Sequence, residues 1–330
     1  MSSTRLLPTL PSILIVSPAL AEANNGNWHT ASRWARMLRG HCRIGVAREW
    51  RGEPCDLLIA LHARRSAASI EAFARARPGR PLVVVLTGTD LYDDIRSDPS
   101  AQASLEHATR LVVLQDQGPL ALPARLRPKC TVIYQSAARL VPVAPAAGLL
   151  TVVSVGHLRA VKDPATFMRA ARRLGHRADI RFEQIGAALD ADLGREAERT
   201  AAQCPRYRWL GDLPRPAARQ RIRRAGLLVS TSRIEGGAHV ILEAAQSATA
   251  VLATAIPGNI GMLGCGHAGG FEVGDDAQLA GLIERARDEP AFLAGLRAQT
   301  EARALLFEPA EEQRRLVEMI ESTLKTPPPP

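Results

Sequence analysis

The sequence predicts an α/β protein built from two doubly wound parallel sheets. Short apolar, β-branched runs alternate with longer amphipathic segments, which is typical of βαβ units. This alternation occurs in two series of similar length, separated by a segment with little periodicity. The chain has 330 residues, of which 46% are hydrophobic and 23% charged, so it is long enough for two domains and too apolar to be disordered.

The first series contains six predicted strands, at residues 13–17, 43–46, 57–61, 82–87, 110–114 and 131–134. Helical patterns separate most of them, notably at residues 30–38 and 67–76. The segment 135–149 is rich in Ala and Pro and is interpreted as a linker.

The second series contains predicted strands at residues 150–155, 180–185, 207–210, 227–230 and 251–253. Predicted helices lie at residues 164–173, 191–203, 215–224 and 239–248, and three more helical stretches follow before the prolines at 327–330. We expect an N-terminal domain over residues 1–143 and a C-terminal domain over residues 144–308. A last helix with its Pro tail, over residues 309–330, should pack back toward the N-terminal domain. The carboxyl ends of both sheets should face a cleft, which is the default site in such folds.

The charge balance favours anionic partners. There are 42 Lys and Arg residues against 33 Asp and Glu residues, which gives a formal net charge of +9. Only Lys129, Lys162 and Lys325 are lysines, and the arginines are scattered over predicted helix faces. Because no aromatic-rich binding motif accompanies the charge, we favour a diffuse solvated surface over a nucleic-acid stripe and expect neither a nucleic-acid nor a membrane partner.

The cysteines and the N-terminus indicate a cytoplasmic protein. The five cysteines include no CxxC pair, which argues against both a disulfide framework and a zinc site. Pro8, Pro11 and Pro18 interrupt the apolar N-terminal stretch, so it is better interpreted as a first strand than as a secretory signal. No run approaches the roughly 20 apolar residues that a membrane helix needs.

The most informative stretch runs from Ser230 to Ala244, with the sequence STSRIEGGAHVILEA. It passes from a strand end through two glycines into a helix, so its backbone can approach a ligand closely and offer amides to a phosphate. Glu235 precedes the helix, and Glu243 lies inside it. One carboxylate can therefore reach a ligand while the other binds a hydroxyl pair such as that of a ribose. The alternative is that Glu235 caps the helix and Glu243 is a surface charge.

A second cluster runs from Gly156 to Pro164, with the sequence GHLRAVKDP. It also follows a strand and precedes a helix, and Pro164 suits the first helical position. Arg159 and Lys162 are three residues apart and could clamp a diphosphate through charge-assisted hydrogen bonds. The alternative is a pair of solvated loop cations.

Three more loops of the first series carry polar candidates. The loop after the first strand includes Asn24, Asn25, Gly26 and Asn27, whose amides and flexible backbone suit a ligand. His29 follows at the start of a helix, where a packed or capping role is the commoner one. The ends of two other strands carry His62, Arg64 and Arg65, and Thr89 and Asp90. A cation pair that feeds a helix N-terminus would make an anion pocket, although an ordinary surface arginine is the expected account for one of the two.

Some common motifs are absent or misleading. Asp190 and Asp192 imitate a metal-binding DxD, but they precede a helix, where Asp is a favoured N-cap. The chain contains no GxGxxG, no GxxxxGK[ST] and no GxSxG, which weakens the nicotinamide-dependent, ATP-driven and serine hydrolase hypotheses.

Taken together, Gly156, Arg159, Lys162 and the Glu235-x7-Glu243 pair resemble the retaining glycosyltransferases of family four, over nearly the whole chain. The resemblance implies a GT-B fold of two Rossmann-like domains. It also implies that an arginine and a lysine bind the donor diphosphate, the first glutamate the sugar and the second the ribose. Gly237 and Ala238 stand where that family usually has an aromatic residue and a glycine.

A closer resemblance is to the selenosugar synthases of selenoneine biosynthesis, and two strings carry it: 17–31 (SPALAEANNGNWHTA) and 256–261 (IPGNIG). It implies that selenophosphate is joined to the anomeric carbon of a UDP-sugar, typically UDP-N-acetylglucosamine, with release of UDP and final loss of phosphate. Neither a cofactor nor an obligatory metal is expected.

The resemblance then assigns roles to individual positions. The catalytic residues would be Arg159, Lys162 and Glu235. The donor would be bound by Gly26, Asn27, Gly156, Gly236, Gly237, Ala238, His239, Val240 and Glu243. The acceptor would be bound by Asn25, His29, His62, Arg64, Arg65, Thr89 and Asp90.

Two alternatives stay open. The first is an ordinary family-four transferase with a carbohydrate or alcohol acceptor, which would need a broader groove with stacking groups. Aromatic residues make up only 4% of the chain, which mildly favours a small acceptor, although Trp28, Trp34 and Trp50 keep this alternative open. The second is a non-enzymatic anion or nucleic-acid binder, which would account for the charge but not for the two loop motifs.

Overall fold

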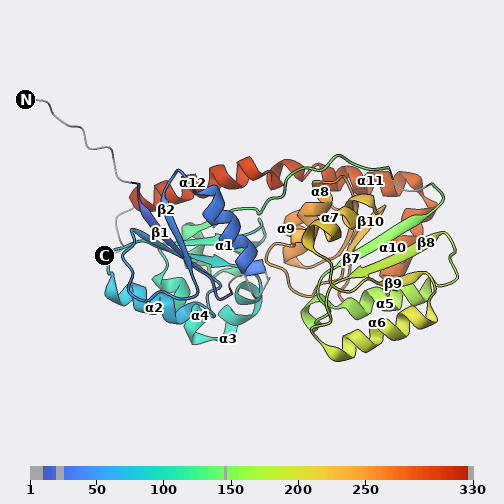
Figure 1. Ribbon diagram of the computed structural model, residues 1–330, viewed down its shortest axis with the longest axis horizontal. Coiled ribbons are helices and arrows are strands. Elements are labelled where there is room, and N and C mark those ends of the chain that lie inside the picture. Colours follow the sequence, from blue (N-terminus) through green and yellow to red (C-terminus); the bar gives the residue numbers. More distant parts are fainter. Residues whose placement is uncertain (1–9, 20–25, 145–146, 326–330) are drawn as a thin grey trace, which may run out of the picture. The chain divides into compact units, whose positions relative to one another are not determined.

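The computed structural model describes residues 10–19, 26–144 and 147–325, and it divides into two compact units (Figure 1). Unit 1 comprises residues 1–133 and 312–330, and unit 2 comprises residues 134–311. Each unit is built around one six-stranded sheet in which every pair of neighbouring strands is parallel. The predicted α/β class with two doubly wound sheets is therefore confirmed.

Unit 1 has the strand order β2-β1-β3-β4-β5-β6, so the order reverses between β1 and β3. Its strands are β1 (Ser12–Val16), β2 (Arg43–Ala47), β3 (Leu57–Leu61), β4 (Leu82–Leu86), β5 (Arg110–Val113) and β6 (Cys130–Val132). Its α-helices are α1 (Gly26–Met37), α2 (Ala67–Ala76), α3 (Ile95–Ser97) and α4 (Pro99–His107), with a π-helical turn η2 (Asp90–Asp94) and two 3-10 turns, η3 (Gly118–Ala121) and η4 (Ala124–Lys129). The central strands β3 and β4 are buried at every residue, as their continuous apolar runs require.

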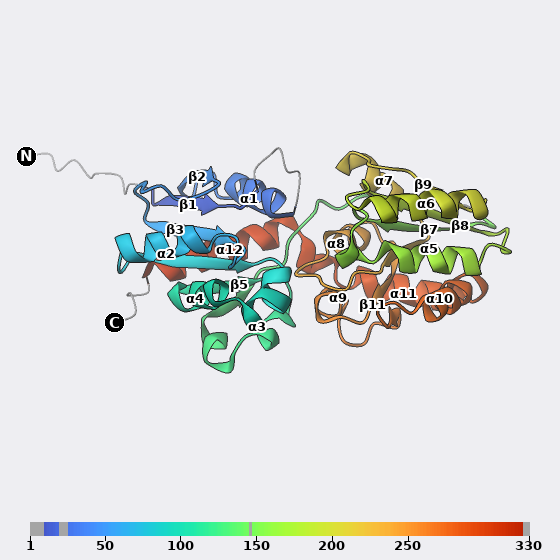
Figure 2. The ribbon, with the colours of Figure 1, turned by 90° about the horizontal axis from the view of Figure 1, so that it is seen from below.

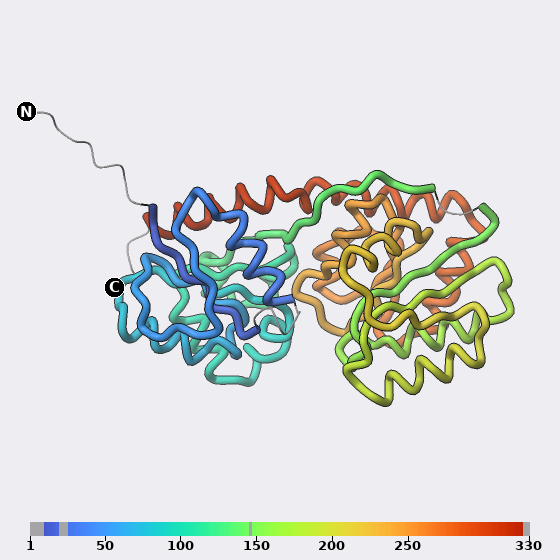
Figure 3. The backbone as a smooth tube through the Cα atoms, viewed as in Figure 1, coloured from blue at the N-terminus to red at the C-terminus, as the bar shows by residue number. Residues whose placement is uncertain are grey.

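The last helix, α12 (Pro309–Lys325), completes the core of unit 1. Leu316, Met319 and Ile320 pack with Trp34 and with apolar side chains on one face of the sheet, while α2 and α4 cover the other face (Figure 2). Figure 3 shows that unit 1 combines two parts of the chain that are far apart in sequence: the N-terminal part (blue to cyan) and the C-terminal helix (red).

Unit 2 has the strand order β12-β11-β10-β7-β8-β9, so the order reverses between β7 and β10. Its strands are β7 (Leu150–Val155), β8 (Ile180–Ile185), β9 (Tyr207–Trp209), β10 (Leu227–Ser230), β11 (Ala250–Thr254) and β12 (Gly270–Phe271). From β9 to β12, this is the 3-2-1-4-5-6 order of a Rossmann fold. Such sheets bind ligands beyond the carboxyl ends of the strands at the reversal point.

Helices of unit 2 connect these strands. They are α5 (Pro164–Arg173), α6 (Ala191–Gln203), α7 (Arg215–Arg224), α8 (His239–Ala245), α9 (Pro257–Leu263), α10 (Asp276–Asp288) and α11 (Pro290–Glu301), with 3-10 turns η5 (Ala160–Lys162) and η6 (Ala304–Phe307). Side chains of α5, α6, α10 and α11 form the main core with the sheet, and α7 and α8 pack against β7 and β10. No helix in the described ranges is long and apolar enough to cross a bilayer.

Most predicted elements occur within one or two residues of their expected bounds, and the differences have local causes. The helix predicted over 239–248 ends at Ala245 because Ala248 adopts a left-handed backbone (φ +52°) that turns the chain into β11. The strand β12 was not predicted, because two residues carry no periodic signal. The expected linker contains no helix or strand in its described part, but it is tied to unit 2: the amide of Leu140 donates to the carbonyl of Gln246 at 2.8 Å.

One buried carboxylate fastens α12 to α1. The side chain of Glu312 is fully buried and accepts hydrogen bonds from Trp34 Nε1 at 2.8 Å and from Arg33 Nε at 3.0 Å. We expect Glu312→Ala to lower the free energy of unfolding of unit 1 by about 3 kcal/mol, because it removes a buried carboxylate that pairs with Arg33 and accepts a hydrogen bond from Trp34. Urea unfolding followed by hydrogen exchange of the α1 and α12 amides measures this loss.

Glu318 on the same helix provides the matched control, since it makes an exposed pair with Arg314 one turn away. Glu318→Ala should change the free energy of unfolding by no more than about 0.5 kcal/mol. Equal losses in the two variants would contradict the assigned role of Glu312.

Candidate active site

Two loops of unit 2 leave neighbouring parallel strands at the reversal point of the sheet. The loop 156–163 follows β7, and the loop 231–238 follows β10. A small polar pocket lies between them, lined by Ser154, Val155, Gly156, Lys162, Pro164, Gln184, Val229, Ser230, Thr231, Ser232, Glu235 and Val240. The structure thus brings Gly156, Lys162, Glu235 and Val240 together in one pocket, which is a requirement for residues that form a single site.

The two loops are bonded to each other through backbone and side-chain contacts. The hydroxyl of Thr231 donates to the carbonyl of Lys162 at 2.9 Å, and the amide of Arg233 donates to the carbonyl of Val161 at 2.9 Å. The Arg233 guanidinium also pairs with Asp163, which is buried in a left-handed conformation (φ +44°) at the start of α5. These contacts place Lys162 opposite the second loop.

Lys162 and Glu235 form an ion pair inside the pocket, with side chains that are 27% and 10% exposed. Glu235 Oε1 also accepts a hydrogen bond from the Ser232 hydroxyl at 2.6 Å, whereas Oε2 accepts none from the described part of the chain. The N-cap of α8 is Ala238, which makes no side-chain capping bond. The interpretation of Glu235 as a helix cap is therefore wrong, and one oxygen of this carboxylate is available to a ligand.

Two glycines allow the close backbone approaches behind this pocket. A Cβ at Gly258, in α9, would collide with the carbonyl of Glu235, and a Cβ at Gly186 would collide with the carbonyl of Gly156. Gly186 also has φ +142°, which only glycine adopts readily. Both sides of the pocket therefore depend on residues that lack a side chain.

Arg159 lies at the rim of the first loop, where it is exposed. Its guanidinium makes no hydrogen bond or ion pair with any described residue. It is therefore a cation that does not have to release a partner in order to bind an anion.

Glu243 lies on α8 and is 5% exposed, so its interpretation as a surface charge is wrong. Arg215, at the start of α7, donates from Nε to Glu243 Oε1 at 3.1 Å and also contacts His239 Nε2. Of the other predicted donor residues, Gly236 and Ala238 are buried and Gly237 is half-buried between Glu235 and the start of α8. A buried carboxylate that a guanidinium holds in place is well placed to orient hydroxyl groups.

In unit 1, α1 begins at Gly26, and three predicted residues lie in its first turn. Gly26 is exposed, Asn27 is 9% exposed and His29 is half-buried. Asn25 and the rest of the loop at 20–25 lie outside the described residues. The predicted donor role of Gly26 and Asn27 and the acceptor role of His29 and Asn25 stay predictions.

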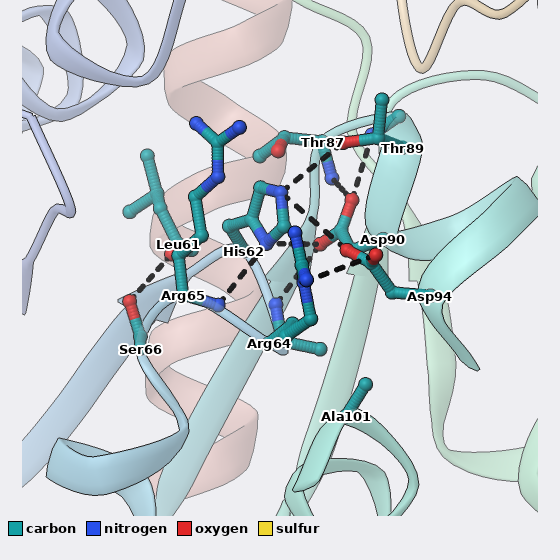
Figure 4. Close-up of polar contacts among 12 residues, drawn as sticks. Leu61, His62, Arg64, Arg65, Ser66, Thr87, Thr89, Asp90, Asp94 and Ala101 are labelled. Atoms are coloured by element: carbon teal, nitrogen blue, oxygen red, sulfur yellow. Dashed lines mark hydrogen bonds and ion pairs between the residues drawn. The ribbon is translucent and has the colours of Figure 1, made fainter. Parts of the chain in front are cut away.

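The loops after β3 and β4 of unit 1 meet around His62, as Figure 4 shows. His62 is 2% exposed and has φ +72°, an uncommon conformation for a residue other than glycine. The amide of Arg65 donates to His62 Nδ1 at 3.3 Å, so the neutral ring carries its proton on Nε2, which lies 3.2 Å from the Thr89 hydroxyl. His62 therefore links the two loops.

Asp90 joins the two loops by accepting hydrogen bonds from their backbone amides. It is fully buried, and its carboxylate accepts backbone hydrogen bonds from Ala63 at 3.0 Å and from Thr87 and Gly88, each at 2.8 Å. These donors occupy both oxygens, which leaves no exposed face for the acceptor contact predicted for Asp90. The sequence showed a polar residue at a strand end but could not show that its partners are local amides.

The two arginines of this loop differ in their surroundings. Arg64 Nε lies 3.0 Å from Asp94 Oδ1, whereas the Arg65 guanidinium is exposed and has no partner among the described residues (Figure 4). Asp94 Oδ2 is buried without a hydrogen-bond donor in the described part of the chain and lies 3.8 Å from His62 Nε2. Arg65 is therefore the free cation of the pair.

Several residues that contact these groups or the loops that carry them had no separate signal in the sequence. They include Asp94, Asp163, Arg215 and Thr254. Ser232 lies within the stretch that the glycines and glutamates marked, but its hydroxyl had no assigned role. By contrast, Asp190 caps α6 by accepting from the amides of Asp192 and Leu193, so the predicted N-cap is confirmed.

Burial lowers the pKa of His62 below its ordinary value of 6.5, and Asp90 and Asp94 only partly oppose that effect. Since the unfolded chain binds this proton more readily, the contribution of His62 to stability is fully present above about pH 6.5 and is lost as the pH falls through that value. We expect His62→Asn, which tolerates a positive φ, to weaken the fall in the free energy of unfolding between pH 7.5 and pH 5.5.

Urea unfolding of unit 1 at the two pH values measures this fall. The exposed His107, at the end of α4, provides the control, and His107→Gln should retain the wild-type fall. If His62→Asn also retained it, His62 would not be the neutral buried group described above.

Comparisons with known proteins agree with this geometry. Residues 150–288 match the family model described as glycosyl transferases group 1. The sequence has no match among the curated proteins with which it was compared.

Similar solved structures extend over both units. HepE from Anabaena, in complex with UDP and glucose, is 15% identical with a TM-score of 0.73, covering 94% of this chain and 100% of that one. Sucrose-phosphate synthase from Thermosynechococcus elongatus is 15% identical with a TM-score of 0.77, covering 95% and 98%. A glycosyltransferase from Rickettsia africae is 14% identical with a TM-score of 0.74, covering 96% and 99%. The predicted GT-B fold is confirmed, and the stretch of unit 2 that matches the family model is similar to glycosyltransferases.

Proposed function

We propose that the protein transfers a sugar from a UDP-sugar, with UDP-N-acetylglucosamine the expected donor, to selenophosphate and releases UDP. One observation carries the donor half of this proposal: the Lys162–Glu235 pair lies in a pocket at the reversal point of a Rossmann sheet. The UDP bound in the Anabaena HepE structure supports the same nucleotide. The acceptor half rests on the sequence resemblance to selenosugar synthases and on the unpaired Arg65 of unit 1.

Lys162 and Arg159 would neutralise the departing diphosphate. An ammonium group has three N–H donors, and Glu235 takes one of them, so two remain for phosphate oxygens. Arg159 has no partner to give up among the described residues. Because Glu235 holds Lys162 in place before the charge develops, the lysine stabilises the transition state with little reorganisation. We therefore propose that no metal is obligatory.

The two glutamates would hold the donor at its two ends. Glu235 Oε2 is open to a sugar hydroxyl, while Oε1 stays bonded to Lys162 and Ser232. Glu243, which Arg215 orients, would accept hydrogen bonds from the ribose hydroxyls. The carboxylate that binds the sugar is thus also the carboxylate that positions the lysine.

The acceptor would be bound by Arg65 and Arg64. Selenophosphate is a small anion whose soft selenium should already be nucleophilic near pH 7, so it needs cations more than a strong base. A selenium lone pair forms the bond to the anomeric carbon, the bond from that carbon to the diphosphate oxygen breaks, and UDP leaves with its electrons. Hydrolysis of the Se–P bond by water then gives phosphate and the 1-selenosugar.

A carbohydrate or alcohol acceptor is the second candidate. A hydroxyl must lose its proton during transfer, so this candidate also requires a group that accepts the proton. This candidate needs the same donor site and differs only in the acceptor.

We expect Lys162→Ala to lower kcat/KM for the UDP-sugar by roughly two orders of magnitude or more, because it removes a charge contact to the leaving group. Steady-state measurement of UDP release gives this ratio.

Lys325 is the matched control, since it is exposed at the end of α12, outside unit 2. Lys325→Ala should keep wild-type kcat/KM. An unchanged kcat/KM in Lys162→Ala would remove this lysine from the donor site.

The direct test is mass spectrometry of a reaction that contains the pure protein, UDP-N-acetylglucosamine and selenophosphate. We expect UDP together with a selenium-containing sugar, because the acceptor supplies the selenium that bonds to the anomeric carbon.

A parallel panel of sugars and alcohols with the same donor separates the two candidates. UDP release only with a member of the panel would select the second candidate. EDTA should leave turnover unchanged, and a loss that magnesium restores would contradict the proposal of a metal-independent reaction.

A further inference from the structure

We propose that Thr254 and Asn259 are positioning residues for the sugar-binding carboxylate Glu235, acting on it through Ser232. This inference rests on the proposed function. It assigns a role to residues in and beside the string 256–261, whose role the pocket and the ion pairs do not explain. Thr254 and Asn259 themselves do not line the pocket.

A continuous chain of buried hydrogen bonds leads from α9 to the pocket. Asn259 Nδ2 donates to the Thr254 hydroxyl at 2.9 Å and to the Thr254 carbonyl at 3.1 Å. The Thr254 hydroxyl donates to the carbonyl of Ser232 at 2.5 Å. The Ser232 hydroxyl then donates to Glu235 Oε1, which also receives Lys162.

This chain is buried along its whole length. Asn259 and Thr254 are each 1% exposed, and Ser232 is 3% exposed. Buried hydrogen bonds of this kind restrict rotation of the groups they join, because no water replaces a lost partner. The Thr254 hydroxyl is therefore the link that connects the end of β11 to the loop after β10.

The backbone of the same segment lies directly against that of Glu235. Gly258, next to Asn259, lies so close to the carbonyl of Glu235 that any Cβ there would collide with it. One short segment thus holds both the backbone and, through Thr254 and Ser232, the carboxylate of Glu235. A small displacement of such a group lowers kcat even when the substrate still binds with the same affinity, because the geometry needed for reaction is lost.

Thr249 provides a matched control for Thr254. Both residues are 1% exposed, and both hydroxyls donate to a carbonyl of another element, since Thr249 Oγ1 lies 2.9 Å from the carbonyl of Ile222. The hydrogen bond of Thr249 leads away from the pocket. A purely structural role therefore predicts the same behaviour for Thr254→Val and Thr249→Val.

The experiment compares kcat and the KM for the UDP-sugar in both variants. We expect Thr254→Val to lower kcat roughly ten-fold with less than about a two-fold change in KM, and Thr249→Val to leave both within about two-fold of wild type. Thr254→Ser keeps the hydroxyl and should restore most of kcat. Equal effects in the two valine variants, or no recovery in Thr254→Ser, would overturn the inference.

Crystal structures of the two valine variants provide a readout that needs no activity. The inference requires that the Ser232–Glu235 hydrogen bond is lost or displaced in Thr254→Val and retained in Thr249→Val. A retained bond in Thr254→Val would overturn it. If the wild-type protein released UDP from no sugar donor, the proposed function would fail while these structures still decided the positioning role.

Discussion

The proposed donor site depends on one electrostatic constraint: Lys162 and Glu235 must share a mostly buried pocket. Removing two charges from water is costly, and their mutual attraction repays this cost only when further hydrogen bonds complete the geometry. Here Ser232 supplies such a bond to the carboxylate, and the tie between Thr231 and the Lys162 carbonyl fixes the lysine loop.

The topology explains why these two residues meet although 73 positions separate them. Strands β7 and β10 are parallel neighbours at the point where strand order reverses, so the loops that follow them leave the same edge of the sheet next to each other. Unit 1 repeats the principle with β1 and β3 at its reversal point, where His62 directly follows β3. Each unit thus places some of its polar candidates at the position that a doubly wound sheet leaves open.

The sequence was sufficient for the strands and for the loops that carry the site. Periodicity located β3, β7, β8 and β10 to the residue, because their apolar runs end abruptly at polar loops. Periodicity could not distinguish Arg64 from Arg65, or Asp90 from Asp94. Those differences arise from partners that only the fold brings together, such as the amides that occupy Asp90 and the carboxylate that holds Arg64.

The arginines illustrate why net charge alone was a weak guide to the site. Many of them balance nearby carboxylates on helix surfaces: Arg177, for example, binds Asp179 and Asp288, which raises the pKa of its guanidinium. Such pairs are partly exposed and contribute little to stability or to ligand binding. Arg159 and Arg65 differ because no described carboxylate faces them, and each lies in the loop after a strand at a reversal point. A cation without a protein partner, in a loop that follows a strand at the reversal point, is available to an external anion, so its surroundings are more informative than the excess of +9.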